Sequence, residues 1–410
     1  MKLELHILQN FAPSNLNRDD TGSPKDCELG GVRRARISSQ CYKRAIRQAF
    51  DQQKLLPQGD LAARTKRLIT KVAERVMKAK GVEEGPAKRA VTSALAAGGL
   101  KADEDETQYL LFLPTRALDA LAGVVSEHFD KLSLDAPKAE PADSADPPKA
   151  AGKKGPSKKK EKSEAKDSAD PAVRAAVEKI LKDASRTPEL ALFGRMIADQ
   201  PGWNVEAACQ VAHAISTHRV SMEFDFYTAV DDLRDEGTAG SGMMGTIQFN
   251  SACFYRYLVV DIGDLKANLG SDGGVTAQAR QAVEALVRAA VLAIPTGKQN
   301  SMAAHNPPSL VFAEVSDGAP PRSLANAFVD PVRPRHDSDL VAQSVLRLGA
   351  YAASLDKVYG AKGRVDRSFV VLDPSDELAK GFNAKLPAAT NRASLDDLVS
   401  ASLNAALGAA

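Results

Sequence analysis

The sequence predicts an α+β protein with a ferredoxin-like core that a helical block interrupts early in the chain. Short runs of alternating, β-branched and aromatic residues predict strands, and apolar residues at helical spacing predict helices around them. A sharp change of composition marks a separate segment inside the helical block. With 410 residues, 44% of them hydrophobic, the chain is long enough to bury a substantial core.

The predicted core elements alternate along the chain. The strands are residues 2–9, 248–261, 309–316 and 367–373, and the helices are residues 39–50 and 275–294, the second ending at Pro295. The order of strand, helix, strand, helix, strand is typical of a ferredoxin-like or RNA-recognition-type sheet with its helices on one face.

The helical block separates the first predicted helix from the second strand. Residues rich in Ala, Leu, Arg and Lys recur at helical spacing over 61–97, 109–132 and 172–192. Between residues 131 and 172, Pro, Ala, Lys, Asp and Ser dominate, so burial cannot offset the entropy of ordering. We expect a disordered insertion there, whose Lys-rich run is more often solvated than bound to a polyanion.

Charge and cysteine content exclude several classes of protein. The 54 Lys and Arg residues balance 52 Asp and Glu, and the net charge of +2 gives no overall attraction to nucleic acid or membrane. The four cysteines are scattered without a CxxC pair, which predicts reduced thiols in a cytoplasmic protein. There is no signal-peptide pattern and no apolar run of membrane-spanning length, so we expect no membrane partner.

The net charge conceals one strongly basic stretch between Gly30 and Arg47. It contains no acidic residue, and its cations are Arg33, Arg34, Arg36, Lys43, Arg44 and Arg47. A solvated face on an amphipathic helix is the ordinary explanation of such a pattern. The three arginines just before the helix favour an anionic partner, because they repel one another unless something neutralises them.

The helix within this stretch suits a phosphate. The helical period places Tyr42, Ile46, Ala49 and Phe50 on one face and Lys43, Arg44 and Arg47 on the other. Ser38 and Ser39 stand where an N-cap belongs, so backbone amides and hydroxyls would converge on an anion there. The loop at residues 297–299 is a second, weaker phosphate candidate.

Aromatic residues gather at Phe224, Phe226 and Tyr227, ahead of a glycine-rich segment. Rings beside a basic surface stack on nucleic-acid bases, although aromatic residues in strands more often belong to a core. The spacing of Gly240, Gly242 and Gly245 fits a dinucleotide motif, but the predicted strand follows it instead of preceding it. We therefore reject a dinucleotide site.

No catalytic motif stands out in the sequence. Asp19, Asp20 and Asp26 are candidates for holding a divalent ion that cleaves RNA. Arg18 and Lys25 beside them favour ion pairing and turn capping instead. We expect no catalytic residue, no metal and no cofactor.

A series of motifs gives the chain a resemblance to a known family. They are NLNRDDTGSPKD and GGVRRARISSQCYKRAIR within residues 15–47, GRM at 194–196, AHAISTH at 212–218, FYTAVDDL at 226–233, GKQ at 297–299 and SLANAF at 323–328. On these residues the chain resembles the CasC family, the repeated backbone subunit of the type I-E CRISPR Cascade surveillance complex. The insertion at 131–172 departs from the family pattern, and the C-terminal end matches it weakly.

The resemblance implies a palm, a finger and a thumb. The RNA-recognition-type palm would comprise residues 1–58, 193–219 and 248–410, the helical finger 59–192, and the β-hairpin thumb 220–247. Subunits would pack side by side along a CRISPR guide RNA, each thumb reaching over its neighbour's RNA, and present bases in segments for pairing with target DNA in antiviral defence. The implied partners are the guide RNA, target DNA, copies of the chain and the large, small, cap and guide-processing subunits of Cascade.

The resemblance also implies individual RNA contacts. Residues that match phosphate-contacting positions are Arg18, Lys25, Lys43 and Arg47. Ser39 and Gln40 match the family's loop that grips the RNA, and Lys298 and Gln299 match a second loop beside the RNA. In the family the thumb displaces one nucleotide at regular intervals; the apolar wedge at that nucleotide matches Met196, and the thumb aromatics match Phe226 and Tyr227. With Arg33, Arg34, Arg36 and Arg44 from the basic stretch, these residues form the predicted RNA-binding set.

Three functions remain open from the sequence. The first is a noncatalytic RNA-binding filament subunit, because phosphate contacts suit a protein that must accept any guide sequence. The second is a metal-dependent, RNA-cleaving backbone subunit of the type III kind that uses Asp19, Asp20 or Asp26. The third is a basic helical scaffold that binds protein only.

Overall fold

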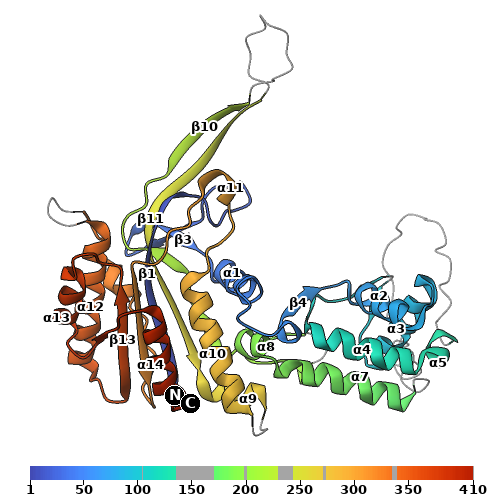
Figure 1. The fold of residues 1–410 in the computed structure, drawn as a ribbon. Coiled ribbons are helices and arrows are strands. Elements are labelled where there is room, and N and C mark those ends of the chain that lie inside the picture. The colour runs from blue at the N-terminus through green and yellow to red at the C-terminus, as the bar shows by residue number, and fades with distance from the viewer. Residues whose placement is uncertain are drawn as a thin grey trace, which may run out of the picture. The chain divides into compact units, whose positions relative to one another are not determined.

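The computed structural model describes residues 1–103, 105–134, 170–197, 201–229, 243–270, 274–334 and 339–409. The chain divides into two units, one formed by Met1–Leu56 with Ala207–Ala410 and the other by Pro57–Glu206. Figure 1 shows the elements of both units. No helix in the described ranges is both long and apolar enough to cross a membrane.

A mostly antiparallel sheet forms the centre of the first unit (Figure 1). Its strands lie in the order β14-β13-β12-β1-β11-β9-β3-β2, and β8 and β10 also pair with β11. Their bounds are β1 (Lys2–Ser14), β2 (Asp26–Leu29), β3 (Val32–Ile37), β8 (Cys209–Val211), β9 (Ala214–Ser216), β10 (Glu223–Ala229), β11 (Met243–Asp261), β12 (Leu310–Ser316), β13 (Arg364–Val371) and β14 (Thr390–Asn391). The four predicted strands are confirmed as parts of β1, β11, β12 and β13.

Strand β1 pairs antiparallel with β11 on one side and β12 on the other, so that Leu5 faces both Leu258 and Ala313. Strands β11 and β12 are therefore parallel to each other, and α10 (Val275–Leu292) lies between them in the chain. A helix that joins two parallel strands across a third is the split βαβ unit of ferredoxin-like folds. The predicted α+β class with a ferredoxin-like core is confirmed.

Helices cover both faces of the sheet, whereas the sequence predicted helices on one face. Phe312 and Phe369 pack with Val345 of α12 (Leu340–Tyr359) and Phe382 of α13 (Glu377–Lys385). On the other face, α14 (Leu395–Leu407) packs against α10 and contacts β12 and β13 (Figure 1). The strands explain this difference, because all seven residues of β12 are buried and both of its faces therefore need cover.

The predicted basic helix is confirmed as α1 (Ser39–Gln52). The Ser38 hydroxyl accepts a hydrogen bond from the Cys41 amide at 3.3 Å, which satisfies one free N–H group at the helix start. The predicted apolar face, which includes Tyr42 and Phe50, is buried. Helix α10 likewise ends just before Pro295, as predicted, and α9 (Ile262–Leu269) and α11 (Gln299–Met302) flank it.

The second unit is mainly helical, with its core between α2, α3, α4 and α7. Its elements are β4 (Ala62–Thr65), α2 (Leu68–Lys80), α3 (Glu84–Ala97), β5 (Ala102–Asp103), β6 (Glu106–Thr107), β7 (Leu111–Pro114), α4 (Thr115–Glu127), α5 (Phe129–Leu134), α7 (Pro171–Asp183) and α8 (Pro188–Phe193). The prediction of helix from residue 61 is wrong at its start, because β4 pairs with the fully buried β7 and this pairing overrides local preference.

Both ends of the predicted insertion at residues 131–172 lie in helices, where the prediction of disorder is wrong. Its first residues, 131–134, end α5, and residues 171–172 begin α7. Residues 135–169, which hold the Lys-rich run, lie outside the described residues.

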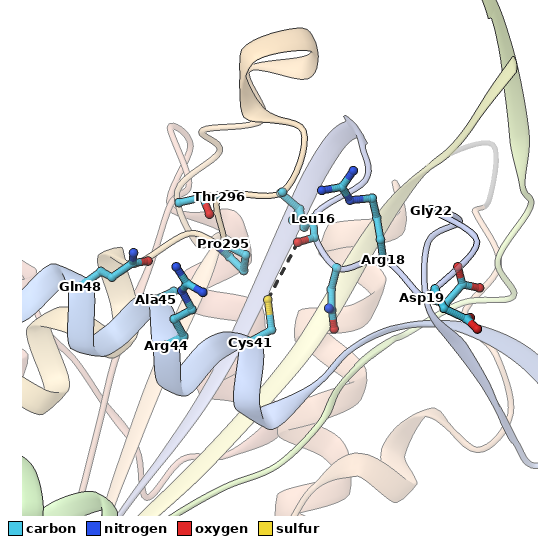
Figure 2. Close-up of a pocket in the computed structure, with 13 residues that line it drawn as sticks. Leu16, Arg18, Asp19, Gly22, Cys41, Arg44, Ala45, Gln48, Pro295 and Thr296 are labelled. Carbon is cyan, nitrogen blue, oxygen red and sulfur yellow. Dashed lines mark hydrogen bonds between the residues drawn. The ribbon is translucent and has the colours of Figure 1, made fainter. Parts of the chain in front are cut away.

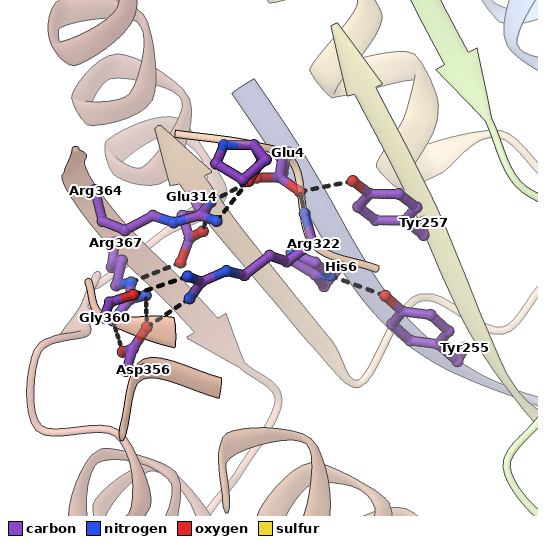
Figure 3. Close-up of polar contacts among 11 residues, drawn as sticks. Glu4, His6, Tyr255, Tyr257, Glu314, Arg322, Asp356, Gly360, Arg364 and Arg367 are labelled. Atoms are coloured by element: carbon purple, nitrogen blue, oxygen red, sulfur yellow. Dashed lines mark hydrogen bonds and ion pairs between the residues drawn. The ribbon is translucent and has the colours of Figure 1, made fainter. Parts of the chain in front are cut away.

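A buried network of charges joins β1, β12, β13 and α12 (Figure 3). The strand register places Glu4 directly opposite Glu314, an arrangement in which two carboxylates repel. Arg364 contacts both carboxylates, with its Nη1 2.8 Å from Glu4 Oε1. Arg367 Nε donates to Glu314 Oε2 at 2.6 Å, and its Nη2 donates to Asp356 Oδ1 at 2.9 Å. The two arginines thus balance the carboxylates that the register brings together.

Replacing Arg367 tests whether this network stabilises the sheet. Removing one partner of a buried ion pair costs about 3–5 kcal/mol, and Arg367→Met should fall near the lower end because Arg364 stays beside Glu314. Urea unfolding measures this loss as a fall in the free energy of unfolding. Lys362→Met removes an exposed cation nearby and should change that free energy by less than about 0.5 kcal/mol. An Arg367→Met protein as stable as this control would contradict the account.

Candidate nucleic-acid interface

Helix α1 presents cations on both sides of a buried stripe. The buried stripe of α1 consists of Tyr42, Ala45, Ile46, Ala49 and Phe50. Lys43 and Arg47, four residues apart, flank this stripe on the side of β8, where the charge of Lys43 acts to lower the pKa of the buried Cys209 thiol. Arg44 and Gln48, also four residues apart, flank the stripe on the other side, beside two loops. All three cations lie on the side of α1 away from its buried residues, as predicted, and Arg44 is a neighbour of Arg47 three residues on.

A pocket of about 550 Å³ opens beside Arg44 and Gln48 (Figure 2). Its walls are α1, the loop at residues 16–22 after β1, and residues 295–297 after α10. Arg18 brings a guanidinium group to the pocket from the loop, and Arg44 brings one from α1 (Figure 2). Within the described residues, neither guanidinium makes an ion pair. Two unpaired cations therefore line one hollow.

Asparagine side chains hold the loop after β1 against its neighbours. Asn15 Nδ2 donates to the Gly22 carbonyl at 3.0 Å and to the Gln248 carbonyl of β11 at 2.9 Å. Asn17 Oδ1 accepts from the Ser38 amide at 2.8 Å, which ties the loop to the start of α1. These bonds fix the position of Arg18 relative to the helix.

The loop after α10 approaches the same region closely. A Cβ atom at Gly297 would overlap the Leu16 carbonyl, so only glycine fits this contact. The Gln299 side-chain nitrogen Nε2 donates to the Pro295 carbonyl at 3.1 Å and to the Ala304 carbonyl at 3.3 Å. Gln299, predicted to contact RNA, thus closes its own loop.

Burial favours the neutral form of two side chains beside the cations of α1 and β3. Burial raises the pKa of the Cys41 thiol against the opposing charges of Lys25 and Arg44, so the thiol stays neutral. Burial lowers the pKa of His213, and Arg36 and Lys25 lower it further. Nδ1 of the neutral His213 lies 3.1 Å from Arg36 Nη1 and accepts a hydrogen bond from it. Among the charges that act on these two groups, cations therefore predominate.

Arg34 is the exception among the predicted cations, and its prediction is corrected. The side chain is fully buried, and Nη2 donates to the carbonyls of Phe328 at 2.7 Å and Val329 at 3.0 Å. Nη1 donates to the Ser216 carbonyl at 3.3 Å. Because carbonyl groups of the protein occupy this guanidinium, Arg34 supports the fold and cannot reach a ligand.

The aspartates considered for a metal serve the local structure. Asp19 Oδ1 accepts hydrogen bonds from the Thr21 amide at 2.9 Å, the Thr21 hydroxyl at 2.8 Å and the Ser23 amide at 3.0 Å. The Thr21 hydroxyl in particular lowers the pKa of Asp19. Asp26 pairs with the exposed Arg33. Across the described ranges, no three His, Cys, Asp or Glu side chains are grouped to hold a metal ion.

Strands β10 and β11 form a hairpin that extends beyond the sheet (Figure 1). Phe226 faces Thr246 across the pair, and Tyr227 faces Gly245. Adjacent strand residues point to opposite faces, so the two predicted thumb aromatics lie on different faces. The Tyr227 ring lies over Gly245, where a Cβ would strike it, while Phe226 is 63% exposed. Residues 230–242 lie outside the described residues.

The remaining predicted residues lie in different places. Ser39 and Gln40 are the first two residues of α1, half-buried and exposed respectively. Lys298 is half-buried and has a left-handed backbone, with φ of 52°. Met196 belongs to the second unit and is 85% exposed.

Sequence reasoning missed several residues that build the pocket, namely Asn15, Asn17, Gln48 and Thr296. Asparagines just after a predicted strand are a known signal for capping backbone groups. Gln48 follows Arg44 by four residues, so the helical period alone would place them together. Thr296 carries no local signal, because only the fold brings it to the loop after β1.

The chain matches known proteins along almost its whole length. The sequence pattern of the CT1975-like protein family matches residues 3–401. One similar solved structure, described as "CRISPR RNA-guided surveillance complex, pre-nicking", has 30% identity and a TM-score of 0.80 over 99% of this chain and 100% of that chain. Another, "CRISPR RNA-guided surveillance complex", has 25% identity and a TM-score of 0.71 over the same shares. A search of curated proteins finds no match. Because the family pattern spans nearly all of its residues, the chain belongs to the CT1975-like protein family.

Proposed function

We propose that this protein is a noncatalytic backbone subunit of a type I-E CRISPR Cascade complex that binds the guide RNA through its phosphates. The likeness to subunits of CRISPR RNA-guided surveillance complexes supports a guide-RNA-binding component of such a complex. The type I-E class rests on the motif resemblance. The observation that carries the proposal is the set of solvent-facing cations gathered around α1 and the loop after β1.

The RNA-binding surface consists of residues that the fold leaves accessible there. They are Arg18, Lys25, Ser39, Gln40, Lys43, Arg44, Arg47 and Lys298, with Arg33 and Arg36 on the neighbouring β2–β3 hairpin. Cations on flexible stems bind phosphates without reading bases, which suits a subunit that must accept any guide. Met196 remains the proposed wedge at a displaced nucleotide.

The exposed hairpin supports assembly of copies along the RNA. All residues of β10 are exposed, and Phe224, Phe226 and Met244 share one face of the hairpin. An exposed apolar row on an otherwise polar protein marks a contact surface. We assign this row to contact with the RNA and a neighbouring copy. The resulting filament would hold the guide for pairing with target DNA, together with the other Cascade subunits, in the cytoplasm.

The first test removes two cations from the β8 edge of α1. Lys43→Ala with Arg47→Ala should weaken binding of single-stranded RNA by the full chain, because two phosphate contacts are lost. The slope of log affinity against log salt should fall by about 1.4, at about 0.7 for each contact to a single strand. Fluorescence anisotropy at several salt concentrations measures both quantities.

Lys357→Ala with Lys362→Ala is the matched control, since it removes two exposed cations at the opposite end of β1 from the loop at 16–22. This control should bind RNA like the unchanged protein. Equal affinity and equal salt slope in the two double variants would contradict a phosphate-binding role for α1.

The second test compares the two hairpin aromatics. Phe226→Ala removes an exposed ring, so it should leave the melting temperature unchanged and reduce the length of protein–RNA assemblies seen by mass photometry. Tyr227→Ala uncovers Gly245 and should loosen the hairpin itself, which hydrogen exchange at β10 detects. Assemblies of unchanged length with Phe226→Ala would show that its face is not a contact surface.

A further inference from the structure

We propose that the pocket between α1 and the loops at 16–22 and 295–297 holds one complete nucleotide of the single-stranded RNA, with its base inside the pocket. This inference rests on the proposed function, because it assigns part of the bound RNA to a defined place. It adds a contact to a base, next to the phosphate contacts of Lys43 and Arg47.

The size and lining of the pocket fit a nucleotide better than a phosphate alone. Its volume of about 550 Å³ lies within the range of small-ligand pockets, about 300–1,000 Å³. Leu16, Ala45 and Pro295 supply apolar surface for a base, and Gln48 and Thr296 supply hydrogen-bonding groups. An amide and a hydroxyl group can each donate and accept hydrogen bonds, so the pocket would accept different bases.

The charges of the pocket place the phosphate. Arg18 and Arg44 are exposed and have no ion-pair partner among the described residues, which leaves both guanidinium groups for a phosphate. Asp19 also lines the pocket, but its carboxylate accepts three hydrogen bonds within its own turn. In Figure 2 it lies beside Gly22, with Arg18 between it and Arg44. Asp20 is exposed at the same end and would accept hydrogen bonds from base N–H groups.

The pocket lies next to the other cations of α1. Arg44 and Gln48 flank the buried stripe of α1 on the side opposite Lys43 and Arg47. Arg44 is nevertheless only three residues from Arg47 on α1, so the two side chains are neighbours on the helix surface. A nucleotide in the pocket can therefore belong to an RNA backbone that also follows Lys43 and Arg47.

Filling the pocket tests the inference without changing its charge. Gln48→Trp places a ring in the hollow and should weaken binding of a short oligouridine by about tenfold, the size of one lost base contact. The same chain of ribose and phosphate with abasic sites should bind the variant within about twofold of the unchanged protein. Lys43→Ala with Arg47→Ala should weaken both probes alike, which separates phosphate binding from base binding.

Two further measurements keep the test decisive. Thr296→Trp fills the pocket from the opposite wall on an exposed loop, so it replaces Gln48→Trp if that variant loses its helical circular dichroism. Oligouridine carrying 4-thiouridine should cross-link to peptides containing residues 16–22, 41–48 or 295–297. Equal effects of a filled pocket on both probes, no effect on either, or cross-links confined to other peptides would overturn the inference. If no variant or control binds RNA at all, the proposed function itself fails.

Discussion

The burial of β1 is the constraint on which the first unit depends. The strand pairs on both sides and is buried from Leu3 to Gln9, so it needs partners at both edges and cover on both faces. Strands β11 and β12 supply the edges, and α10, α14, α12 and α13 supply the cover. The register that follows puts Glu4 against Glu314, and Arg364 and Arg367 are needed to balance them.

The same strand positions the candidate interface. Its pairing with β11 shifts in register between Phe11 and Ser14, where the chain leaves the sheet and turns into the loop at 16–22. Asn15 and Asn17 then attach this loop to β11 and to the start of α1. Arg18 and the cations of α1 are thus held on a rigid frame, which lets flexible side chains meet a phosphate at a fixed place.

Local charge governs the expected chemistry more than the net charge of +2. Cations gather around α1 and β3, while nearby acids such as Asp19 and Asp26 are occupied by turns and by Arg33. Arg34 shows that a count of cations in the sequence overstates the positive charge on the surface, since its guanidinium donates hydrogen bonds to three carbonyls of the protein. A nearly neutral chain can therefore present a basic surface to RNA.

Much of the core could be predicted from the sequence, because β1, β11, β12, β13, α1 and α10 each carry a clear local pattern. Strand β4 could not, since its residues look helical and only the pairing with β7 makes them a strand. The basic residues of the site were found by their density. The burial of Arg34 and the contribution of Thr296 depend on contacts distant in sequence.

The most direct measurement of the central claim is the identity of nucleic acid that co-purifies with the protein when its neighbouring genes are expressed with it. We expect an RNA of uniform length that carries CRISPR-repeat sequence, released by high salt because phosphate contacts hold it. Absence of RNA at physiological salt, or RNA of mixed length and unrelated sequence, would contradict it.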